Sequence, residues 1–544
     1  MESTSYLALT AILLYSVWKL FKIAAREPFL PPGPPGVPIL GNILEFPKHS
    51  AYSNDPVKVY LVYGFGEWAK QYGGIYSLKL GYKTAIVLND INAVRELLDK
   101  RSGTTIDRPL SLAAELVMDG VHMAFGRYDM PWRGQRKIAG IILSPNSVQQ
   151  NHPIQRAEAI QVLHDFLETP ADFFEHIFRY SNSVIMSVLW GKRYPRHNTK
   201  EALEIHEAGH IWSQIAAPGA IPPLDILPFL NYIPERWAKW KRLVKDLREK
   251  QRKTHLALFD ECERRMKSGE GNGSYMEEVL RRQEEFGLSR EVLGYMGTVL
   301  IEGGSDTTAA VLQSLLLFLT AHPEVQRKAQ AELDRVVGNQ RLPVLEDFDN
   351  LPYLQAIIKE THRIRPIAPI AIPHATTQPE QYGGYTIPQG AAIFSNTYGI
   401  LHDPDPETFN PERFLLTEHG TKPGVDDSGF RANLVFGFGR RICPGIHLAR
   451  NSLALNTMNL LWAFKYELAK DPVTGKEMPV DLWGYKQGHT LIPKPFKCHI
   501  VPRGEYVKEI VEREFRGATD LFVKYERDLA PEDKEWVERV RERW

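Results

Sequence analysis

A glycine-rich loop that carries a single cysteine constrains this chain more than any other feature. Residues 436–445 read Phe-Gly-Phe-Gly-Arg-Arg-Ile-Cys-Pro-Gly, and an apolar run typical of a helix begins at Ile446. Glycine permits backbone turns that a Cβ would obstruct, so the loop can pass close to a flat, bulky group. Cys443 precedes the predicted helix N-terminus, where the dipole and unpaired N–H groups favour a thiolate. Arg441 adds positive charge nearby, and such a thiolate suits haem iron as an axial ligand.

The loop resembles the haem-binding signature of the cytochrome P450 superfamily. That signature fixes five positions, which this chain matches with Phe436, Gly439, Arg441, Cys443 and Gly445. The resemblance implies that Cys443 ligates the iron of haem b and that the other four residues belong to the haem-binding loop. A buried structural cysteine in a tight turn is the alternative, and five matches within ten residues argue against it.

The mostly apolar stretch at residues 289–321 predicts a helix roughly 50 Å long, at 1.5 Å per residue. Gly303 and Gly304 interrupt it, although each glycine costs a helix about 1 kcal/mol relative to alanine. We expect the missing side chains to leave room for a substrate, with Asp306 and Thr307 beside the gap. The segment resembles the oxygen-activation segment of the family, which implies that Asp306 and Thr307 organise proton delivery. A helix kink with incidental polar residues is the alternative.

Two further pairs match motifs of the same family. Trp132 and Arg136 lie one helical turn apart, so an indole N–H and a guanidinium should point the same way. The resemblance implies that both donate to a haem propionate, a use that suits paired donors. Glu360 and Arg363 are spaced to form an ion pair. For these two the resemblance implies a buried structural cluster with Arg413.

A proline-rich segment after the Glu-x-x-Arg helix is expected to be extended, because proline restrains the residue before it. The resemblance implies that this segment lines the substrate pocket with Ile370, Ala371 and Ile372. It also implies that His374 contacts a propionate. The turn at residues 487–491 looks like the one that reaches the substrate from the far wall through Thr490.

A different motif appears at residues 206–210, which spell His-Glu-Ala-Gly-His. H-E-x-x-H is the zinc-binding helix motif of metalloproteases. That site needs a further ligand, and no Gly-x-x-His continuation follows here. Gly209 also weakens the helix that such a site requires. We therefore interpret the motif as a chance occurrence on a solvated helix face.

The N-terminal region contains an apolar run, residues 6–18, followed by Lys19 and Lys22. The run is shorter than the about 20 residues that a spanning helix needs, but flanking lysines can snorkel to the interface. Positive charge after the run favours an uncleaved signal-anchor over a cleaved signal peptide. We predict one transmembrane helix within residues 1–30, with the remainder of the chain on the cytosolic side.

Three further regions are expected after the anchor. Residues 31–42 are a proline-rich hinge, and residues 43–502 are the catalytic domain. Residues 503–544 are densely charged, with apolar side chains at helical spacing. We expect this extension to pack onto the domain; contact with a partner or a membrane is the alternative.

Composition excludes little but is consistent with these expectations. The 544 residues carry 66 basic and 66 acidic side chains, so no nucleic acid partner is expected. The three cysteines are Cys262, Cys443 and Cys498, an odd set without paired spacing. This pattern is typical of a reducing compartment rather than of a disulfide framework.

The resemblance spans residues 31–502 and implies the mainly α cytochrome P450 fold with a smaller β region. It implies a monooxygenase that inserts one atom of O2 into a lipophilic small molecule, by hydroxylation or epoxidation. No segment reads as a flavin or nicotinamide domain, so NADPH-derived electrons would come from an NADPH–cytochrome P450 reductase or cytochrome b5. The expected docking surface begins at Arg440 and Arg441. The expected location is the endoplasmic reticulum membrane, with the catalytic domain facing the cytosol.

The sequence does not identify the substrate. A general similarity to filamentous-fungal members of secondary metabolism suggests an aromatic or polyketide intermediate. The first alternative is a non-oxygenating isomerase or dehydratase of the same family, which the intact Asp306–Thr307 pair argues against. A haem-binding sensor without turnover and a helical membrane scaffold without haem are further alternatives from other classes.

Overall fold

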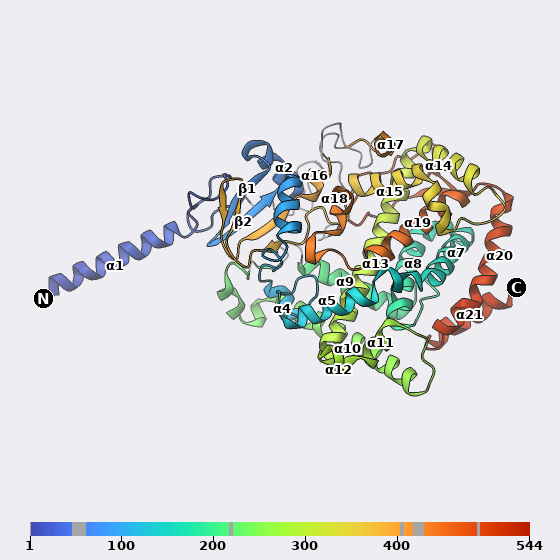
Figure 1. Ribbon diagram of the computed structural model, residues 1–544, viewed down its shortest axis with the longest axis horizontal. Coiled ribbons are helices and arrows are strands. Elements are labelled where there is room, and N and C mark those ends of the chain that lie inside the picture. The colour runs from blue at the N-terminus through green and yellow to red at the C-terminus, as the bar shows by residue number, and fades with distance from the viewer. Residues whose placement is uncertain are drawn as a thin grey trace.

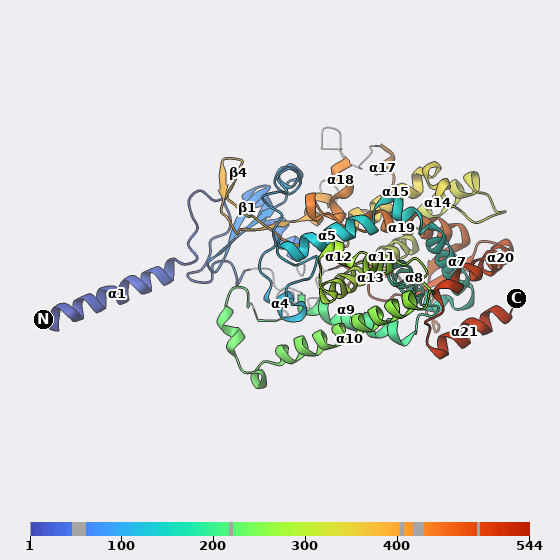
Figure 2. The same ribbon diagram turned by 60° about the horizontal axis from the view of Figure 1, so that its bottom comes forward.

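A long central helix organises the structure, and the sheet that contains β1 (Ile75–Leu80) and β2 (Lys83–Leu88) lies toward the N-terminal side (Figure 1). The computed structural model describes residues 2–45, 61–216, 221–222, 224–402, 407–416, 429–486 and 490–543. Most of the turn expected at residues 487–491 therefore lies outside the described residues. In both views α1 (Glu2–Lys22) extends away from the body, and the C-terminal helices lie at the opposite end (Figures 1 and 2).

The central helix is α13 (Arg290–Ala321), as the apolar stretch predicted. It begins where the Ser289 side chain accepts a hydrogen bond from the Val292 N–H. Its neighbours are α8 (Phe173–Trp190), α10 (Lys239–Lys267) and α19 (Ile446–Ala463). Because α13 is buried along most of its length, its apolar residues face neighbours on all sides.

The largest sheet has four strands in the order β1-β2-β6-β3. Strands β1 and β2 form a hairpin and pair antiparallel. Strand β2 pairs in parallel with β6 (Ala392–Ser395), and β6 pairs antiparallel with β3 (His374–Ala375). This register fixes His374 at the sheet edge. The two smaller sheets pair β4 (Glu380–Tyr382) with β5 (Tyr385–Ile387), and β7 (Phe464–Leu468) with β8 (Cys498–Pro502).

Shorter helices surround this framework. They are α2 (Leu61–Tyr72), α3 (Ile91–Val94), α4 (Leu112–Met118), α5 (Met130–Ile142), α6 (Pro145–Gln149), α7 (His152–Glu168), α9 (Lys200–Ala216), α11 (Tyr275–Arg281), α12 (Gln283–Phe286), α14 (Pro323–Val336), α15 (Pro352–Ile364), α16 (Thr397–His402), α17 (Arg413–Leu416) and α18 (Gly429–Asn433).

The expected cluster around Glu360 is present. Arg363 donates to both carboxylate oxygens of Glu360, at 2.7 and 2.9 Å, and Arg413 Nε lies 3.1 Å from Glu360 Oε2. The Asn410 N–H donates to the same carboxylate at 2.7 Å. A buried carboxylate needs such partners, since an isolated charge would be strongly destabilising there. The cluster joins α15 to the segment that precedes α17.

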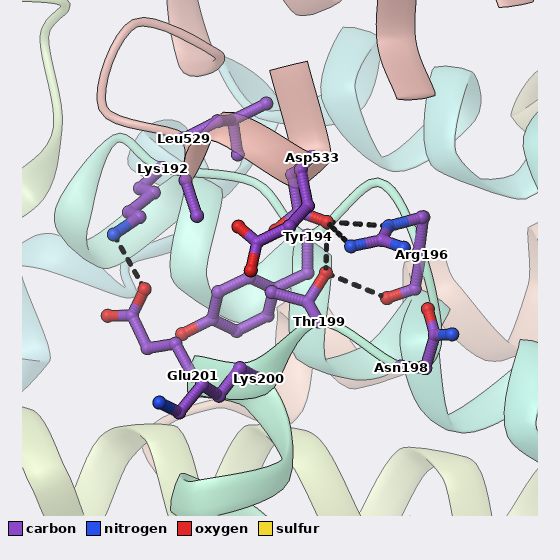
Figure 3. A pocket seen from close by; sticks show the side chains of 11 residues that line it. Lys192, Tyr194, Arg196, Asn198, Thr199, Lys200, Glu201, Leu529 and Asp533 are labelled. Atoms are coloured by element: carbon purple, nitrogen blue, oxygen red, sulfur yellow. Dashed lines mark hydrogen bonds and ion pairs between the residues drawn. The ribbon is translucent and has the colours of Figure 1, made fainter. Parts of the chain in front are cut away.

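The C-terminal extension packs onto the body, as expected. Helix α20 (Glu505–Phe522) lies against α7 and buries an apolar face that includes Val507, Ile510, Val511, Phe515 and Phe522. Helix α21 (Pro531–Glu542) follows. Figure 3 shows Asp533 of α21 pointing toward Arg196 and Thr199, with an Arg196–Asp533 distance of 2.6 Å. Polar contacts thus hold the extension where its apolar face ends.

A buried charged network extends this attachment. Arg193 contacts Glu526 at 2.8 Å and Glu158 at 2.9 Å, and its guanidinium lies 3.5 Å from the centre of the Phe522 ring. Arg541 binds the other oxygen of Glu526 at 2.5 Å. Glu158 and Glu526 are far apart in the sequence but contact the same guanidinium, so this network ties the extension to α7.

The predicted transmembrane helix is not established by the structure. Helix α1 exposes Tyr6, Ile12, Leu14 and Trp18. Among the described residues, no single helix combines the length and hydropathy of a membrane span; only the pair α13 and α14, bent by 108°, passes that test.

Replacing Phe515 tests whether the extension stabilises the body. Phe515 is 1 % exposed, and its ring stacks on His164 with centroids 4.2 Å apart. Phe515→Ala should lower the free energy of unfolding by about 3–5 kcal/mol, measured by urea denaturation. Val523→Ala is the matched control, because Val523 is 52 % exposed in the same extension. Equal midpoints for the two variants would show that the extension is only loosely attached.

Candidate functional site

The middle of α13, the cysteine loop, α5 and the segment before β3 surround a cavity of about 390 Å³. The predicted residues that line it are Trp132, Arg136, Gly303, Gly304, Asp306, Thr307, Ala371, Ile372, His374, Phe436, Arg441, Cys443, Gly445 and Thr490. Residues far apart in the sequence are thus brought to one place.

Two predicted residues do not line the cavity. Gly439 has φ +48°, and a Cβ there would lie 2.4 Å from the Ser102 Cβ, so it allows the loop to pack against the preceding chain. Ile370 packs against the apolar cluster of the N-terminal sheet, beside Phe65 and Tyr76. Gly439 therefore affects the cavity only through the backbone of the cysteine loop. The expectation that Ile370 lines the pocket is wrong.

The cysteine loop holds Cys443 at the start of α19. The Cys443 N–H donates to the Phe436 carbonyl at 2.7 Å, which closes the loop. Burial raises the pKa of the Cys443 thiol, whereas a hydrogen bond from the Gly445 N–H and the charge of Arg136 act in the opposite direction. The positive charge near the sulfur therefore comes from Arg136, not from Arg441 as expected.

Arg441 is buried instead of lying on a basic surface. Its guanidinium donates to the carbonyls of Ile106 at 2.8 Å and Gly126 at 3.0 Å, and it stacks 3.8 Å from the Trp132 ring centre. The Trp132 N–H donates to the Met123 carbonyl at 2.9 Å. The Trp132 ring thus packs against the Arg441 guanidinium, and the indole N–H is used by the backbone. Of the two expected donors, only Arg136 directs its side chain to the cysteine loop, where it donates to the Ile442 carbonyl.

Positive groups gather around the cavity. Burial and then the charge of Arg441 lower the pKa of Arg108 well below its usual value, and burial followed by Arg108 does the same for His374. Burial and Arg136 lower the pKa of Arg441 to about 9, against the opposing charge of Asp107. A group bearing two carboxylates would relieve this repulsion. The donor set therefore fits haem, whose propionates are such carboxylates, with Cys443 as iron ligand.

Arg108 is a site residue that sequence reasoning missed. It donates to the carbonyls of Ala124 at 3.0 Å, Ile372 at 2.6 Å and Pro373 at 3.0 Å. These bonds join the chain after β2 to the extended segment before β3. The residue stands in a stretch without a clean hydrophobic period, so no local signal marked it.

The two glycines of α13 serve different purposes. A Cβ on Gly304 would lie 2.6 Å from Ile185 of α8, so this glycine allows close helix packing. A Cβ on Gly303 would meet nothing within 4 Å, so only Gly303 widens the space beside the helix. The Thr307 hydroxyl donates to the Gly303 carbonyl at 2.6 Å. The gap and the hydroxyl therefore lie together at the cavity wall.

The H-E-x-x-H segment forms part of α9, and the expectation that it is merely a solvated face is wrong for His206. His206 Nδ1 lies 3.5 Å from Asp306 Oδ1, and its ring packs on Phe178 with centroids 4.3 Å apart. Glu207 pairs with Lys250 at 3.0 Å on the surface. Among the described residues, no group of three or more His, Cys, Asp or Glu side chains could hold a metal ion. His206 instead connects Asp306 to the outside of α9.

This combination of helical fold, cysteine loop and cationic cavity defines a class of haem-thiolate proteins, and the comparisons agree. The family model described as Cytochrome P450 matches residues 31–498. A cytochrome P450 monooxygenase from Armillaria gallica is 42% identical over 526 residues, 96% of this chain and 98% of the relative. One from Aspergillus niger is 36% identical, covering 95% of this chain and 98% of the relative. The chain belongs to the cytochrome P450 family.

Solved structures support the same assignment. A zebra fish cytochrome P450 solved with progesterone has a TM-score of 0.66 and 25% identity, covering 82% of this chain and 100% of the other. The abiraterone structure gives a TM-score of 0.65, also at 25% identity, covering 81% and 99%.

Substituting the cysteine tests the ligand assignment. Cys443→His should abolish the red-shifted Soret band of the reduced carbon monoxide complex, because that band requires a thiolate ligand. Cys498→Ser is the matched control, since Cys498 lies in β8 and does not line the cavity. Absorption spectra of the purified proteins provide the measurement. An unchanged band in Cys443→His would refute the assignment.

Proposed function

We propose that this protein is a haem-thiolate monooxygenase of fungal secondary metabolism. It inserts one oxygen atom from O2 into a lipophilic small molecule, by hydroxylation or epoxidation. The observation that carries the proposal is the placement of Cys443 and of the Asp306–Thr307 pair around one cavity. The monooxygenase names of the Armillaria and Aspergillus relatives, which match over nearly the whole chain, support it.

The residues that would hold haem follow from the donor set. Cys443 would ligate the iron, and Arg108, Arg136 and Arg441 would neutralise the propionates, with His374 beside them. His374 Nδ1 is held by the Thr105 carbonyl at 2.9 Å, which orients the ring at the sheet edge. When bound, haem supplies the electron transfer to O2 and the cleavage of the O–O bond.

Proton supply is the part played by the chain itself. Thr307 keeps its hydroxyl at the cavity wall by donating to Gly303, and it can hold a water molecule there. Asp306 also lines the cavity and contacts His206, whose side chain is 37 % exposed. Protons can therefore pass from solvent through His206 and Asp306 to the cavity. The intact acid–hydroxyl pair favours oxygenation over the isomerase and dehydratase alternative.

Electrons are proposed to come from an NADPH–cytochrome P450 reductase, with cytochrome b5 as a second donor. The proposed docking surface lies at the cysteine loop, where Arg440 is exposed. The substrate is proposed to be an aromatic or polyketide intermediate, in keeping with the apolar cavity lining.

The proposed location is the endoplasmic reticulum membrane, with the catalytic domain on the cytosolic side. The exposed apolar residues of α1 support this, and Phe229, Tyr232 and Trp237 add a second apolar surface. The segment that carries them lies at the same end of the body as α1 in both views (Figures 1 and 2).

The proton pathway makes a prediction about Thr307. In Thr307→Ala the hydroxyl is lost, so NADPH should still be consumed but many of its electrons should appear as hydrogen peroxide. Proton transfer by a positioned group typically contributes about 10²–10⁴-fold, which bounds the loss of product formation. The ratios of NADPH, peroxide and product provide the measurement.

Thr320→Ala is the matched control for this experiment. Thr320 lies on the same helix and donates to the Leu316 carbonyl at 2.8 Å, as Thr307 does to Gly303, but does not line the cavity. Unchanged coupling in Thr307→Ala would remove the role assigned to the hydroxyl. Loss of haem in that variant alone would make the segment structural.

Truncation tests the membrane proposal. Arg26 donates to the Pro34 carbonyl at 2.7 Å, and Glu27 pairs with Lys79 at 3.1 Å, so the residues before the hinge already contact the body. A chain that begins at Ala24 should therefore bind haem and become extractable without detergent. Fractionation and the carbon monoxide spectrum measure both properties. Complete retention in the membrane fraction would contradict α1 as the principal anchor, and adding Phe229→Ser and Trp237→Ser would test the second surface.

A further inference from the structure

A further carboxyl group lines the cavity beside Gly303. Glu302 immediately precedes Gly303 on α13, lines the cavity, and is 14 % exposed at its side chain. Gln251 Nε2 of α10 donates to Glu302 Oε1 at 2.9 Å. Helix α10 packs against both α9 and α13 (Figure 2). The carboxyl group is therefore held in place, and neither the haem site nor the proton pathway uses it.

The second oxygen of Glu302 faces a histidine. His122 Nε2 lies 3.9 Å from Glu302 Oε2, beyond hydrogen-bond distance. The Ala124 N–H donates to His122 Nδ1 at 3.0 Å, so in the neutral ring the proton is on Nε2. His122 Nε2–H is thus a donor whose orientation is fixed by the backbone.

The protonation of Glu302 decides what this pair can bind. Burial, reinforced by the charge of Asp306 one turn along the helix, raises the pKa of Glu302 to about 8. The carboxyl group is therefore mainly neutral at pH 7. Because Oε1 accepts from Gln251, the proton belongs on Oε2. Two donors, Oε2–H and Nε2–H, then converge across 3.9 Å.

Aromatic rings surround this point. The His122 ring lies 5.0 Å from Phe125 and 5.2 Å from Trp212, and the latter two are 5.5 Å apart in an edge-to-face arrangement. All three line the cavity. Aromatic side chains in such geometry favour further ring contacts.

We propose that Glu302 and His122 bind a carbonyl oxygen of the substrate while Phe125 and Trp212 contact its ring. The substrate class is then a ring compound that carries a carbonyl group, rather than a plain hydrocarbon. Each donor uses one lone pair of the carbonyl oxygen, which has two. The inference rests on the proposed monooxygenase function and specifies what occupies its cavity.

A matched pair of probes tests the proposal on the haem-loaded enzyme. Acetophenone and ethylbenzene have similar shape but differ in the carbonyl group. Calorimetric titration should show acetophenone binding more tightly, and Glu302→Leu should weaken it by about 5- to 10-fold with little effect on ethylbenzene, as expected for one lost hydrogen bond. Infrared spectroscopy should show the carbonyl stretch of bound acetophenone at lower frequency in the unaltered enzyme than in the variant.

Two further variants separate recognition from structural damage. Glu302→Gln keeps a donor and should retain most of the affinity. Glu291→Leu is the matched control, because Glu291 lies in the first turn of the same helix and pairs with Arg252 at 3.2 Å on the surface. Equal binding of both probes by the unaltered enzyme would overturn the inference, and so would an unchanged carbonyl frequency in Glu302→Leu.

The pH dependence provides an independent arm. Acetophenone affinity should be constant below about pH 8 and fall above it, because deprotonation of Glu302 removes the Oε2–H donor. Burial raises the pKa of Glu302 to about 8, which sets this limit. The other titratable groups near Glu302 are Asp306 on its own helix, His122, and His206 and His210 of α9. Glu302→Gln should abolish the fall, whereas a persistent fall would assign it to those groups and contradict the inference.

The same preparation distinguishes failure of the monooxygenase function from failure of the carbonyl-binding inference. A missing thiolate band in the carbon monoxide spectrum would overturn the monooxygenase function together with this inference. An intact band with equal affinity for both probes would overturn the inference alone.

Discussion

The architecture around the cavity depends on two buried arginines whose positive charge is not neutralised by the hydrogen bonds that hold them. Arg108 and Arg441 give their N–H groups largely to backbone carbonyls, among them those of Ile372, Ile106 and Gly126. A carbonyl satisfies a hydrogen bond but leaves the charge of the guanidinium in place, whereas a carboxylate would cancel it. The cavity consequently retains a positive potential that only an anionic group can balance. Segments far apart in sequence are joined by the same bonds, so the fold around the cavity and the binding of that group are physically linked.

The sequence predicted the parts of the site whose cause is local. The cysteine loop and the helix capped by Ser289 were predicted because glycine conformations and helix caps are decided by neighbouring residues. The cluster of Glu360 with Arg363 was found because a helical spacing encodes it.

What the sequence did not predict requires long-range packing. Gly303 and Gly304 look equivalent in the chain, yet only contact with Ile185 separates a packing glycine from one that opens a cavity. Arg108 and Glu302 carried no motif, because their partners come from other segments of the chain. Nothing local in the H-E-x-x-H pattern indicated that His206 would contact Asp306. The position of Arg441 was mistaken for the same reason, since a charged residue in a loop is ordinarily on the surface.

The buried contact between Arg193 and Glu526 has a consequence for the order in which the molecule is made. Domains assemble from the N-terminus as the chain leaves the ribosome. Arg179 and Arg193 are synthesised with Glu158 and Asp165 as buried acidic partners, so these four side chains already balance in charge. Glu526 follows Arg193 by 333 residues and brings Arg541 as a partner of its own. The contact between Arg193 and Glu526 therefore forms only after the intervening chain has been made, and it joins a late segment to helices that were synthesised much earlier.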